Sequence, residues 1–406
     1  MRRSKRPAYE GGAPIRSEFL HFHRPDIGKA EEREVLETLR SGWLTTGART
    51  KRFEARFAEL VGAKYAVAVN SCTAALHLGL AVLDIGPGDE VVTTPMTFGA
   101  SANVIVHTGA RPVFVDVDPE RLTIDPRHIE AAVTSHTRAI LPVHYLGQPC
   151  ELAAIRRIGR KHKLAVVEDA AHAVETVADG RKVGSISELT AFSFYANKNM
   201  TTGEGGMLTT NRKRLAERAR ILSLHGMSRD AWKRFSSSGF RHYRHVEAGF
   251  KYNMFDIQAA LGIHQLDRLE RSLKARRKAF AIYVDALKDV AGITPLAQRE
   301  RSGDRNAFHL FVVRVDKRRA GLTRDELLAA LAAENIGCGV HYRALHLQPY
   351  YRRQFGFRSG MFPVAEKAGR EVLSLPFFPS IRRRDIEDVA DAIRRIVSYR
   401  LERRVR

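Results

Sequence analysis

The sequence is 406 residues long, more than one small hydrophobic core needs, which favours a large domain accompanied by a smaller one. Its 44% hydrophobic and 28% charged residues are typical of globular proteins, and no apolar run reaches the roughly 20 residues that span a bilayer. The formal net charge is +22, but no nucleic-acid-binding module is recognisable, so we expect no nucleic-acid partner. Attraction to anionic small molecules or membrane headgroups is a better explanation, and an Arg-rich composition on solvated faces is the best one.

The N-terminal segment, 1–25, is basic and lacks the apolar stretch of a secretory signal. The three cysteines, Cys72, Cys150 and Cys338, are far apart and form no CxxC pair. This spacing argues against a disulfide framework and against a zinc site. It fits a reducing compartment, so we expect a cytoplasmic protein.

Residues 26–255 are predicted to form a large α/β domain. Seven short apolar runs are predicted as strands: YAVAV (65–69), EVVTT (90–94), PVFVDV (112–117), AILPV (139–143), LAVVED (164–169), TAFSF (190–194) and GMLTT (206–210). Helical patterns separate most of these runs, which indicates a mostly parallel seven-stranded sheet covered on both faces. Such sheets bind ligands at the carboxyl ends of their strands.

Residues 256–406 are predicted to form a linking helix and a small α+β domain. A polar, Arg- and Ser-rich loop (228–245) precedes a long helical pattern that begins at Asp256. The expected elements that follow are a strand (309–315), a helix (323–336), a short strand near Gly339 and a last helix from about Arg384.

Several side chains that can take part in catalysis or binding lie at or just after the ends of predicted strands in the large domain. Asp169 ends one strand and His172 lies three residues later. Ser193 lies near the end of the next strand, and Lys198 follows it before the glycine-rich turn TTGEGG. Singly, each has a commoner structural explanation, such as a surface lysine or a capping acid. Together they predict a site at one edge of the sheet.

These residue types suit pyridoxal phosphate. A partly buried lysine can form a Schiff base with its aldehyde, and a carboxylate can keep its pyridine nitrogen protonated. Amides at the helix start, Thr73 and Ala74, can hold the phosphate together with the Ser193 hydroxyl, and Phe98 can stack on the ring. The glycines of GEGG would let the backbone pass close to the cofactor.

A series of motifs supports this interpretation. They are SGWLTTG (41–47), NSCTAALHLGL (70–80), TTPMTFGASAN (93–103), PVFVDVD (112–118), PVHYLGQP (142–149), VVEDAAHA (167–174), SFYANKNMTTGEGG (193–206) and GFKYNMFDIQAALG (249–262). Over residues 18–400 the sequence resembles the pyridoxal-phosphate sugar aminotransferases of the DegT/StrS family. This resemblance implies the aspartate-aminotransferase-like fold (fold type I) and an enzyme that transfers amino groups.

The resemblance also implies roles for individual residues. Lys198 looks like the Schiff-base lysine and Asp169 like the partner of the pyridine nitrogen. His172 matches the residue near the 3-oxygen, Phe98 the stacking aromatic, and Thr73, Ala74 and Ser193 the phosphate cradle. Asn253 is expected to reach the cofactor phosphate of the other subunit, so a homodimer with composite active sites is expected. Cys72 departs from the glycine of many relatives.

The implied reaction moves an amino group from L-glutamate to a nucleotide-linked keto sugar. The motifs look most similar to those of the enzyme that forms UDP-4-amino-4-deoxy-L-arabinose, which suggests a UDP-linked 4-keto sugar and a role in lipid A modification or another lipopolysaccharide pathway. Candidate substrate residues are Trp43, Thr46, His341 and Arg343.

Three alternatives remain open at this point. One is an aminotransferase for a 3-keto dTDP- or GDP-sugar, and another is a non-catalytic regulator of the same fold. The third is a metal-dependent hydrolase that would use Asp169, His172 and His144. The sequence lacks HExxH or comparable ligand spacing, so we expect no metal site.

Overall fold

A computed structural model describes residues 6–228, 243–298 and 300–405. Its main feature is a seven-stranded sheet with the order β1-β9-β8-β5-β4-β2-β3. The strands are β1 (Tyr65–Val69), β2 (Glu90–Thr93), β3 (Arg111–Phe114), β4 (Thr137–Ile140), β5 (Ala165–Asp169), β8 (Leu189–Ser193) and β9 (Gly206–Thr210). Only β9 runs antiparallel to its neighbours, β1 and β8. The predicted mostly parallel sheet is therefore confirmed.

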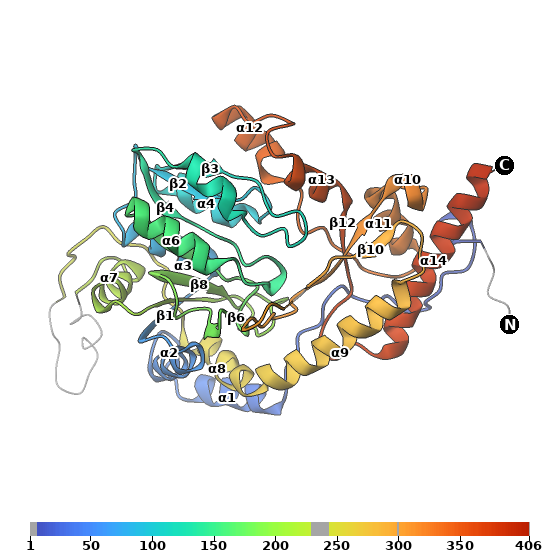
Figure 1. The fold of residues 1–406 in the computed structure, drawn as a ribbon. Coiled ribbons are helices and arrows are strands. Elements are labelled where there is room, and N and C mark those ends of the chain that lie inside the picture. The colour runs from blue at the N-terminus through green and yellow to red at the C-terminus, as the bar shows by residue number, and fades with distance from the viewer. Residues whose placement is uncertain (1–5, 229–242, 299, 406) are drawn as a thin grey trace.

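Helices bury both faces of this sheet, because its strands are apolar on both sides. One core contains side chains of α2 (Ala48–Val61), α6 (Leu152–His162) and α8 (Asp256–Gln265). The other contains side chains of α3 (Cys72–Ala81), α4 (Gly99–His107) and α7 (Lys213–Ser223). Helix α1 (Lys29–Arg40) lies with α2 and α8 at the bottom of Figure 1.

The long helix predicted from Asp256 is interrupted in the structure. A 3-10 turn, Leu266–Arg268, separates α8 from α9 (Leu269–Leu287). Helix α8 packs beneath the seven-stranded sheet, whereas α9 reaches a second core. The domain boundary at residue 255 therefore stays a prediction.

The second core surrounds a three-stranded antiparallel sheet. Its strands are β10 (Ile293–Pro295), β11 (Phe311–Val315) and β12 (Val372–Leu375), and its helices include α11 (Arg324–Ala333) and α14 (Arg383–Val405). The prediction of a short strand near Gly339 is wrong, because this residue forms only an isolated β-bridge, to Ser374. Strands β10 and β12 were not predicted.

Residues 6–20 also lie at this end of the molecule (Figure 1). The N–H of Leu20 donates to the carbonyl oxygen of Asn335 at 2.8 Å, and the Leu20 carbonyl accepts from Gly337 at 2.8 Å. The predicted loop 228–245 lies mostly outside the described residues.

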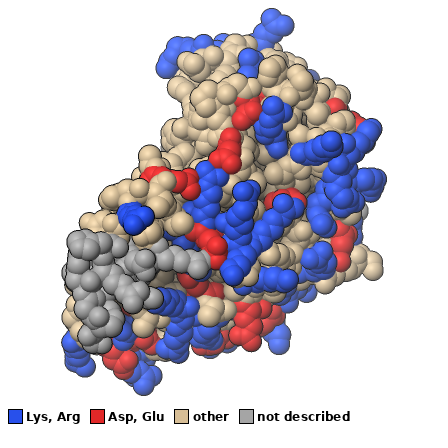
Figure 2. All heavy atoms as spheres, turned by 90° about the vertical axis from the view of Figure 1, so that its left-hand side faces the viewer, with Lys and Arg blue, Asp and Glu red and all other residues tan. Residues whose placement is uncertain are grey.

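Basic and acidic side chains are mixed on the face of the molecule that Figure 2 shows. Figure 2 shows Lys and Arg side chains on one face with Asp and Glu side chains between them. Several basic side chains of the protein are paired, as in Arg220 with Glu54 at 2.8 Å and Arg218 with Glu247 at 2.9 Å. Among the described residues, no helix is long and apolar enough to cross a membrane.

Candidate active site

A cavity of about 560 Å³ opens at the carboxyl ends of β5 and β8. The start of α3, the loop before α4 and the segment 340–342 complete its wall. Seven residues predicted from the sequence line it, namely Thr73, Phe98, Asp169, His172, Ser193, Lys198 and His341. Its size suits a small-molecule or cofactor site.

Lys198 lies in a tight turn after β8, in which its backbone N–H donates to the carbonyl oxygen of Tyr195 at 2.9 Å. The residue keeps some accessible surface because it faces the cavity, although protein surrounds its ammonium group. Burial lowers the pKa of Lys198 to about 8, and the neighbouring Cys72 and Asp169 oppose this effect. A lysine with such a pKa supplies neutral amine near neutral pH, as a nucleophile or base requires.

Asp169 ends β5 and is 5% exposed. Its Oδ2 accepts the hydroxyl of Ser101 at 2.7 Å, and its Oδ1 accepts the backbone N–H of Ala171 at 3.0 Å. Burial raises the pKa of Asp169, whereas these two hydrogen bonds and Lys198 oppose the rise. A carboxylate held in this way can stabilise a cation placed against it, such as a protonated ring nitrogen.

The start of α3 faces the cavity, and helix N-termini attract anions. Thr73 is exposed there, and Ser193 also lines the wall. Ala74 is buried behind the wall, where its N–H donates to the hydroxyl oxygen of Ser71 at 3.1 Å. The structure thus brings Thr73 and Ser193 to the cavity but leaves Ala74 with an internal partner.

The glycines after Lys198 serve two contacts. Gly205 lines the cavity, in line with the predicted close approach of the backbone. Gly206 instead packs on the chain at the start of α3, because a Cβ there would lie 2.5 Å from the carbonyl carbon of Ser71. Only glycine allows this approach.

Aromatic rings form another part of the wall. Phe98 is 65% exposed, and its ring centroid lies 6.1 Å from that of Tyr342. Tyr342 also stacks on His172 at 6.2 Å, with its hydroxyl oxygen 3.2 Å from the His172 Nε2. Burial and Lys198 lower the pKa of His172 well below its usual value, so the imidazole is neutral and Tyr342 donates to it.

Sequence reasoning missed Tyr342 and Ser101. Tyr342 lies in the stretch HYRALH (341–346) and Ser101 in the motif TTPMTFGASAN (93–103), but nothing in either local pattern distinguishes them. His341, which was predicted, packs on Phe22 at 5.5 Å and lies with its Nδ1 2.8 Å from the Ser374 hydroxyl. Burial, assisted by Lys198, lowers the pKa of His341 to about 4.

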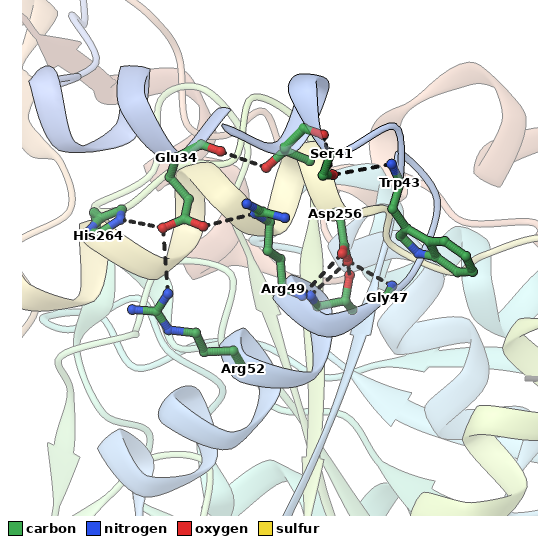
Figure 3. A network of polar contacts seen from close by, with 10 residues as sticks. Glu34, Ser41, Trp43, Gly47, Arg49, Arg52, Asp256 and His264 are labelled. Atoms are coloured by element: carbon green, nitrogen blue, oxygen red, sulfur yellow. Dashed lines mark hydrogen bonds and ion pairs between the residues drawn. The ribbon is translucent and has the colours of Figure 1, made fainter. Parts of the chain in front are cut away.

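Three other predicted residues lie together, away from this cavity. Asn253 Nδ2 donates to the hydroxyl oxygen of Thr46 at 2.7 Å, and the Trp43 indole N–H donates to the Thr46 carbonyl at 3.2 Å. Thr46 and Asn253 line a separate cavity of about 420 Å³ between α2, β1 and α7. Figure 3 shows Trp43 at the edge of the polar network that holds this segment.

Arg343 is also outside the main cavity, on the surface, where it pairs with Asp325 at 3.7 Å. His144 is buried, with Nε2 2.8 Å from a Glu168 carboxylate oxygen and Nδ1 accepting the N–H of Cys150 at 3.0 Å. Across the described ranges, no group of three or more His, Cys, Asp or Glu side chains could hold a metal ion.

Comparison with known sequences identifies the family. The sequence model of the DegT/DnrJ/EryC1/StrS aminotransferase family matches residues 25–394. The chain belongs to this family. It is a pyridoxal-phosphate-dependent aminotransferase, and fold type I is confirmed.

Individual relatives agree with this assignment. The chain is 52% identical to the spore coat polysaccharide biosynthesis protein SpsC of Bacillus subtilis, over 94% of this chain and 98% of that protein. It is 33% identical to the sugar aminotransferase Spr1654 of Streptococcus pneumoniae in its PMP-form, with a TM-score of 0.87 and coverage of 96% and 100%. It is 31% identical to DesI, solved in the presence of its TDP-sugar product, with a TM-score of 0.84 and coverage of 98% of each chain.

The residues of the main cavity fit pyridoxal phosphate. A lysine with a lowered pKa, a buried carboxylate, an exposed aromatic ring and a helix N-terminus meet in one space of suitable volume. None of these relatives' names specifies a UDP-linked 4-keto sugar, so the resemblance to the UDP-4-amino-4-deoxy-L-arabinose enzyme stays a prediction.

Proposed function

We propose that the enzyme transfers the amino group of L-glutamate to a nucleotide-linked keto sugar, with Lys198 as its catalytic residue. The observation that carries this proposal is the presence of Lys198, with its pKa lowered to about 8, in the same cavity as the buried carboxylate of Asp169. A base that changes protonation state near pH 8, beside a fixed acid, suits proton transfer on a bound cofactor.

The proposed roles of the cavity residues follow from their chemistry. Asp169 would hold the protonated ring nitrogen of the cofactor, and His172 would lie near its 3-oxygen. Phe98 would cover one ring face, while Thr73 and Ser193 would bind the phosphate at the start of α3. Ala74 keeps its predicted place in this cradle only if its N–H exchanges the Ser71 hydroxyl for the phosphate.

When bound, pyridoxal phosphate supplies an electron sink that stabilises negative charge at the amino-bearing carbon. Lys198 Nζ would take up a proton as a neutral amine and release it again as an ammonium group. The half-buried position of Lys198 supports this role because burial disfavours the charged form.

We also propose a homodimer with composite active sites. Asn253 and Thr46 line their own cavity and do not reach the cofactor cavity of the same chain, as expected for residues that serve a second subunit. Large apolar side chains are exposed in the same region, on α1, in the following loop and just before α8: Leu36, Leu39, Trp43, Leu44 and Phe255. Burying them between two copies would remove this apolar surface from water.

A UDP-linked 4-keto sugar is the first acceptor that we propose, on the strength of the motifs SGWLTTG, PVHYLGQP and HYRALHLQPYYR (341–352). The TDP-sugar product of DesI favours a TDP-linked sugar as the second candidate. The name of SpsC supports a product destined for a polysaccharide, so lipopolysaccharide modification is one of several possible uses.

The test is the absorbance spectrum of the protein before and after L-glutamate is added without acceptor. We expect the absorbance of bound pyridoxal phosphate to give way to that of pyridoxamine phosphate. Keto sugars that carry UDP, dTDP or GDP and a ketone at position 3 or 4 are then added one at a time. The acceptor is the one that restores the absorbance of bound pyridoxal phosphate. Lys198→Ala should bind the cofactor without responding to glutamate.

A protein that binds pyridoxal phosphate but responds to no amino donor would instead support a non-catalytic regulator. A protein that stays colourless after incubation with pyridoxal phosphate would contradict the assignment of the cavity.

A further inference from the structure

A row of buried and half-buried polar side chains lies behind His172 and is not used by the proposed reaction. The imidazole ring of His309 packs against the ring of His172, with centroids 4.3 Å apart. His309 Nδ1 lies 3.0 Å from Asn199 Oδ1. Asn199 Nδ2 in turn lies 3.0 and 2.8 Å from the two carboxylate oxygens of Glu175. The row therefore runs from Glu175, through the residue next to Lys198, to a ring on the cavity wall.

The hydrogen bonds fix the orientation of the Asn199 amide. Its Nδ2 faces acceptors only, because besides Glu175 it lies 2.8 Å from the carbonyl oxygen of Ala307. Its Oδ1 must then face His309 and accept a proton from Nδ1. Burial and the nearby His172 and Lys198 lower the pKa of His309 well below its usual value. The ring is thus neutral, with its single proton on Nδ1 and a bare Nε2.

Two buried groups of opposite charge, Glu175 and Arg276, contact this row of side chains. Glu175 is 1% exposed, and Arg276 on α9 is fully buried, with its Nη1 donating to the carbonyl oxygen of His309 at 3.1 Å. Burial raises the pKa of Glu175 to about 7, and the attraction of Arg276 and the hydrogen bond from Asn199 limit the rise. The carboxylate is an acceptor at both oxygens only while it is ionised.

Within the part of the chain that the structure describes, few other charged groups face Glu175. Lys182 on β7 (Arg181–Lys182) attracts the carboxylate from one side. Arg305 Nε donates to the Glu175 backbone carbonyl at 2.9 Å, so this guanidinium binds the main chain and not the carboxylate. The side chain that responds directly to the state of Glu175 is therefore Asn199.

We propose that Glu175 is a positioning residue of this aminotransferase: through Asn199 it keeps the proton of His309 on Nδ1 and so fixes the ring on which His172 packs. This inference rests on the proposed function, because His172 matters for catalysis only if the cofactor lies beside it. Without the ionised Glu175 carboxylate, whose two oxygens both accept from Asn199, the Asn199 amide could turn and present Nδ2 to His309. The His309 proton would then move to Nε2, so the ring would donate from Nε2 and accept at Nδ1.

The first measurement is made on the apoprotein. Histidines are labelled with ¹⁵N, the His309 signals are assigned with a His309→Gln variant, and the protonated ring nitrogen is read in the wild type and in Glu175→Gln. The measurement is made above pH 8, where Glu175 is ionised. We expect a proton on Nδ1 in the wild type and its loss from Nδ1 in the variant. Glu175→Asp, which keeps a carboxylate, should restore the wild-type state in part. Asn199→Ala breaks the same link and replaces Glu175→Gln if that variant does not fold.

The second measurement is the absorbance of bound pyridoxal phosphate as a function of pH. We expect Glu175→Gln to move the midpoint of this titration by on the order of half a pH unit, because His172 borders the chromophore. The matched control is Glu366→Gln, another buried carboxylate that lies 3.1 Å from a histidine, His346, outside the cavity. This control should leave the midpoint unchanged.

The outcomes separate the two proposals. A His309 proton that stays on Nδ1 in both Glu175→Gln and Asn199→Ala would overturn the inference, whatever the enzyme does. So would an unchanged absorbance midpoint in a variant whose His309 proton has moved. Failure of the wild type to bind pyridoxal phosphate would overturn the proposed function, whereas the effect of Glu175 on His309 would still be measured in the apoprotein.

Discussion

The carboxylate of Asp256 closes the N-terminus of α2 by accepting two hydrogen bonds from Thr50, at 2.9 Å from its backbone N–H and at 2.7 Å from its hydroxyl. The N–H groups of Gly47 and Arg49 donate to the same carboxylate, at 2.8 and 3.1 Å (Figure 3). A Cβ on Gly47 would clash with the indole nitrogen of Trp43 and lie 2.7 Å from this carboxylate, so any larger residue would displace both side chains. One buried acid thus joins the segment before α2 to the segment that carries Asn253.

Replacing Asp256 with alanine is expected to lower the free energy of unfolding by about 2 to 4 kcal/mol, because three backbone donors and a hydroxyl lose their acceptor at a buried helix start. The change is measured by chemical denaturation of the apoprotein. Asp267→Ala is the control, since the side chain of Asp267 is 57% exposed in its pair with Arg56 and should contribute within about 0.5 kcal/mol. Equal losses in both variants would contradict the capping role.

Lys198 should make the apoprotein less stable at neutral pH. Its pKa is about 8 in the folded chain, against about 10.4 for an unperturbed lysine. Between these values the unfolded chain binds more protons, so the free energy of unfolding rises as the pH rises from about 8 to about 10.4. Below pH 8 the buried ammonium group opposes folding in full.

Lys198→Met is therefore expected to raise the melting temperature of the apoprotein at pH 7 by roughly 2 °C or more, and the gain should shrink by pH 10. Lys213→Met, at a lysine whose side chain is 71% exposed, should show no such dependence on pH. If the wild type is at least as stable as Lys198→Met at pH 7, burial of the ammonium group does not lower the free energy of unfolding, and this prediction is wrong.

The main sheet and the centre of the site could be predicted because they depend on local patterns. Apolar runs of five or six residues separated by helical periodicity define parallel strands, and residues just after such strands must meet at one edge. Lys198, Asp169 and Ser193 were found in this way. Strand β12 was missed because VLSL is short and follows a helix directly, without a turn signal.

The remaining parts of the site depend on contacts between distant segments. Tyr342 reaches His172 across 170 residues, and Asn199 reaches His309 across 110. No periodicity encodes such pairs, since each partner has an ordinary local environment. Trp43, Thr46 and Arg343 show the converse, because their motifs placed them near the substrate whereas a single chain holds them away from the cavity.

The thiols should react slowly in the folded protein. Burial and the nearby Asp169 raise the pKa of Cys72, although this residue lines the cavity, and burial raises the pKa of Cys338. Cys150 is buried, with its Sγ donating to the Val143 carbonyl at 3.1 Å. At pH 8 we expect each thiol to be alkylated by iodoacetamide at least roughly tenfold more slowly than in the denatured chain. Fast modification of Cys72, located by mass spectrometry, would contradict this expectation.

Ser101→Ala should weaken cofactor binding through Asp169. The Ser101 hydroxyl donates to Asp169 Oδ2 and limits the rise of its pKa, so its loss raises this pKa further. A protonated Asp169 cannot stabilise a protonated ring nitrogen, and a hydrogen bond to a charged group contributes about 1.5 to 3 kcal/mol. The dissociation constant of pyridoxal phosphate is therefore expected to rise at least about tenfold at pH 7.

The same variant predicts a change of pH dependence. Cofactor affinity falls when the pH drops through the pKa of Asp169, and in Ser101→Ala this fall should begin at a higher pH than in the wild type. The affinity is measured by titrating pyridoxal phosphate at several pH values. Thr108→Ala is the control, because its hydroxyl binds the Ile105 carbonyl at 2.8 Å at the far end of α4 and does not reach the cavity. If both variants bind the cofactor as the wild type does at every pH, Ser101 does not tune Asp169, and the backbone N–H of Ala171 is then the remaining hydrogen bond that holds the carboxylate ionised.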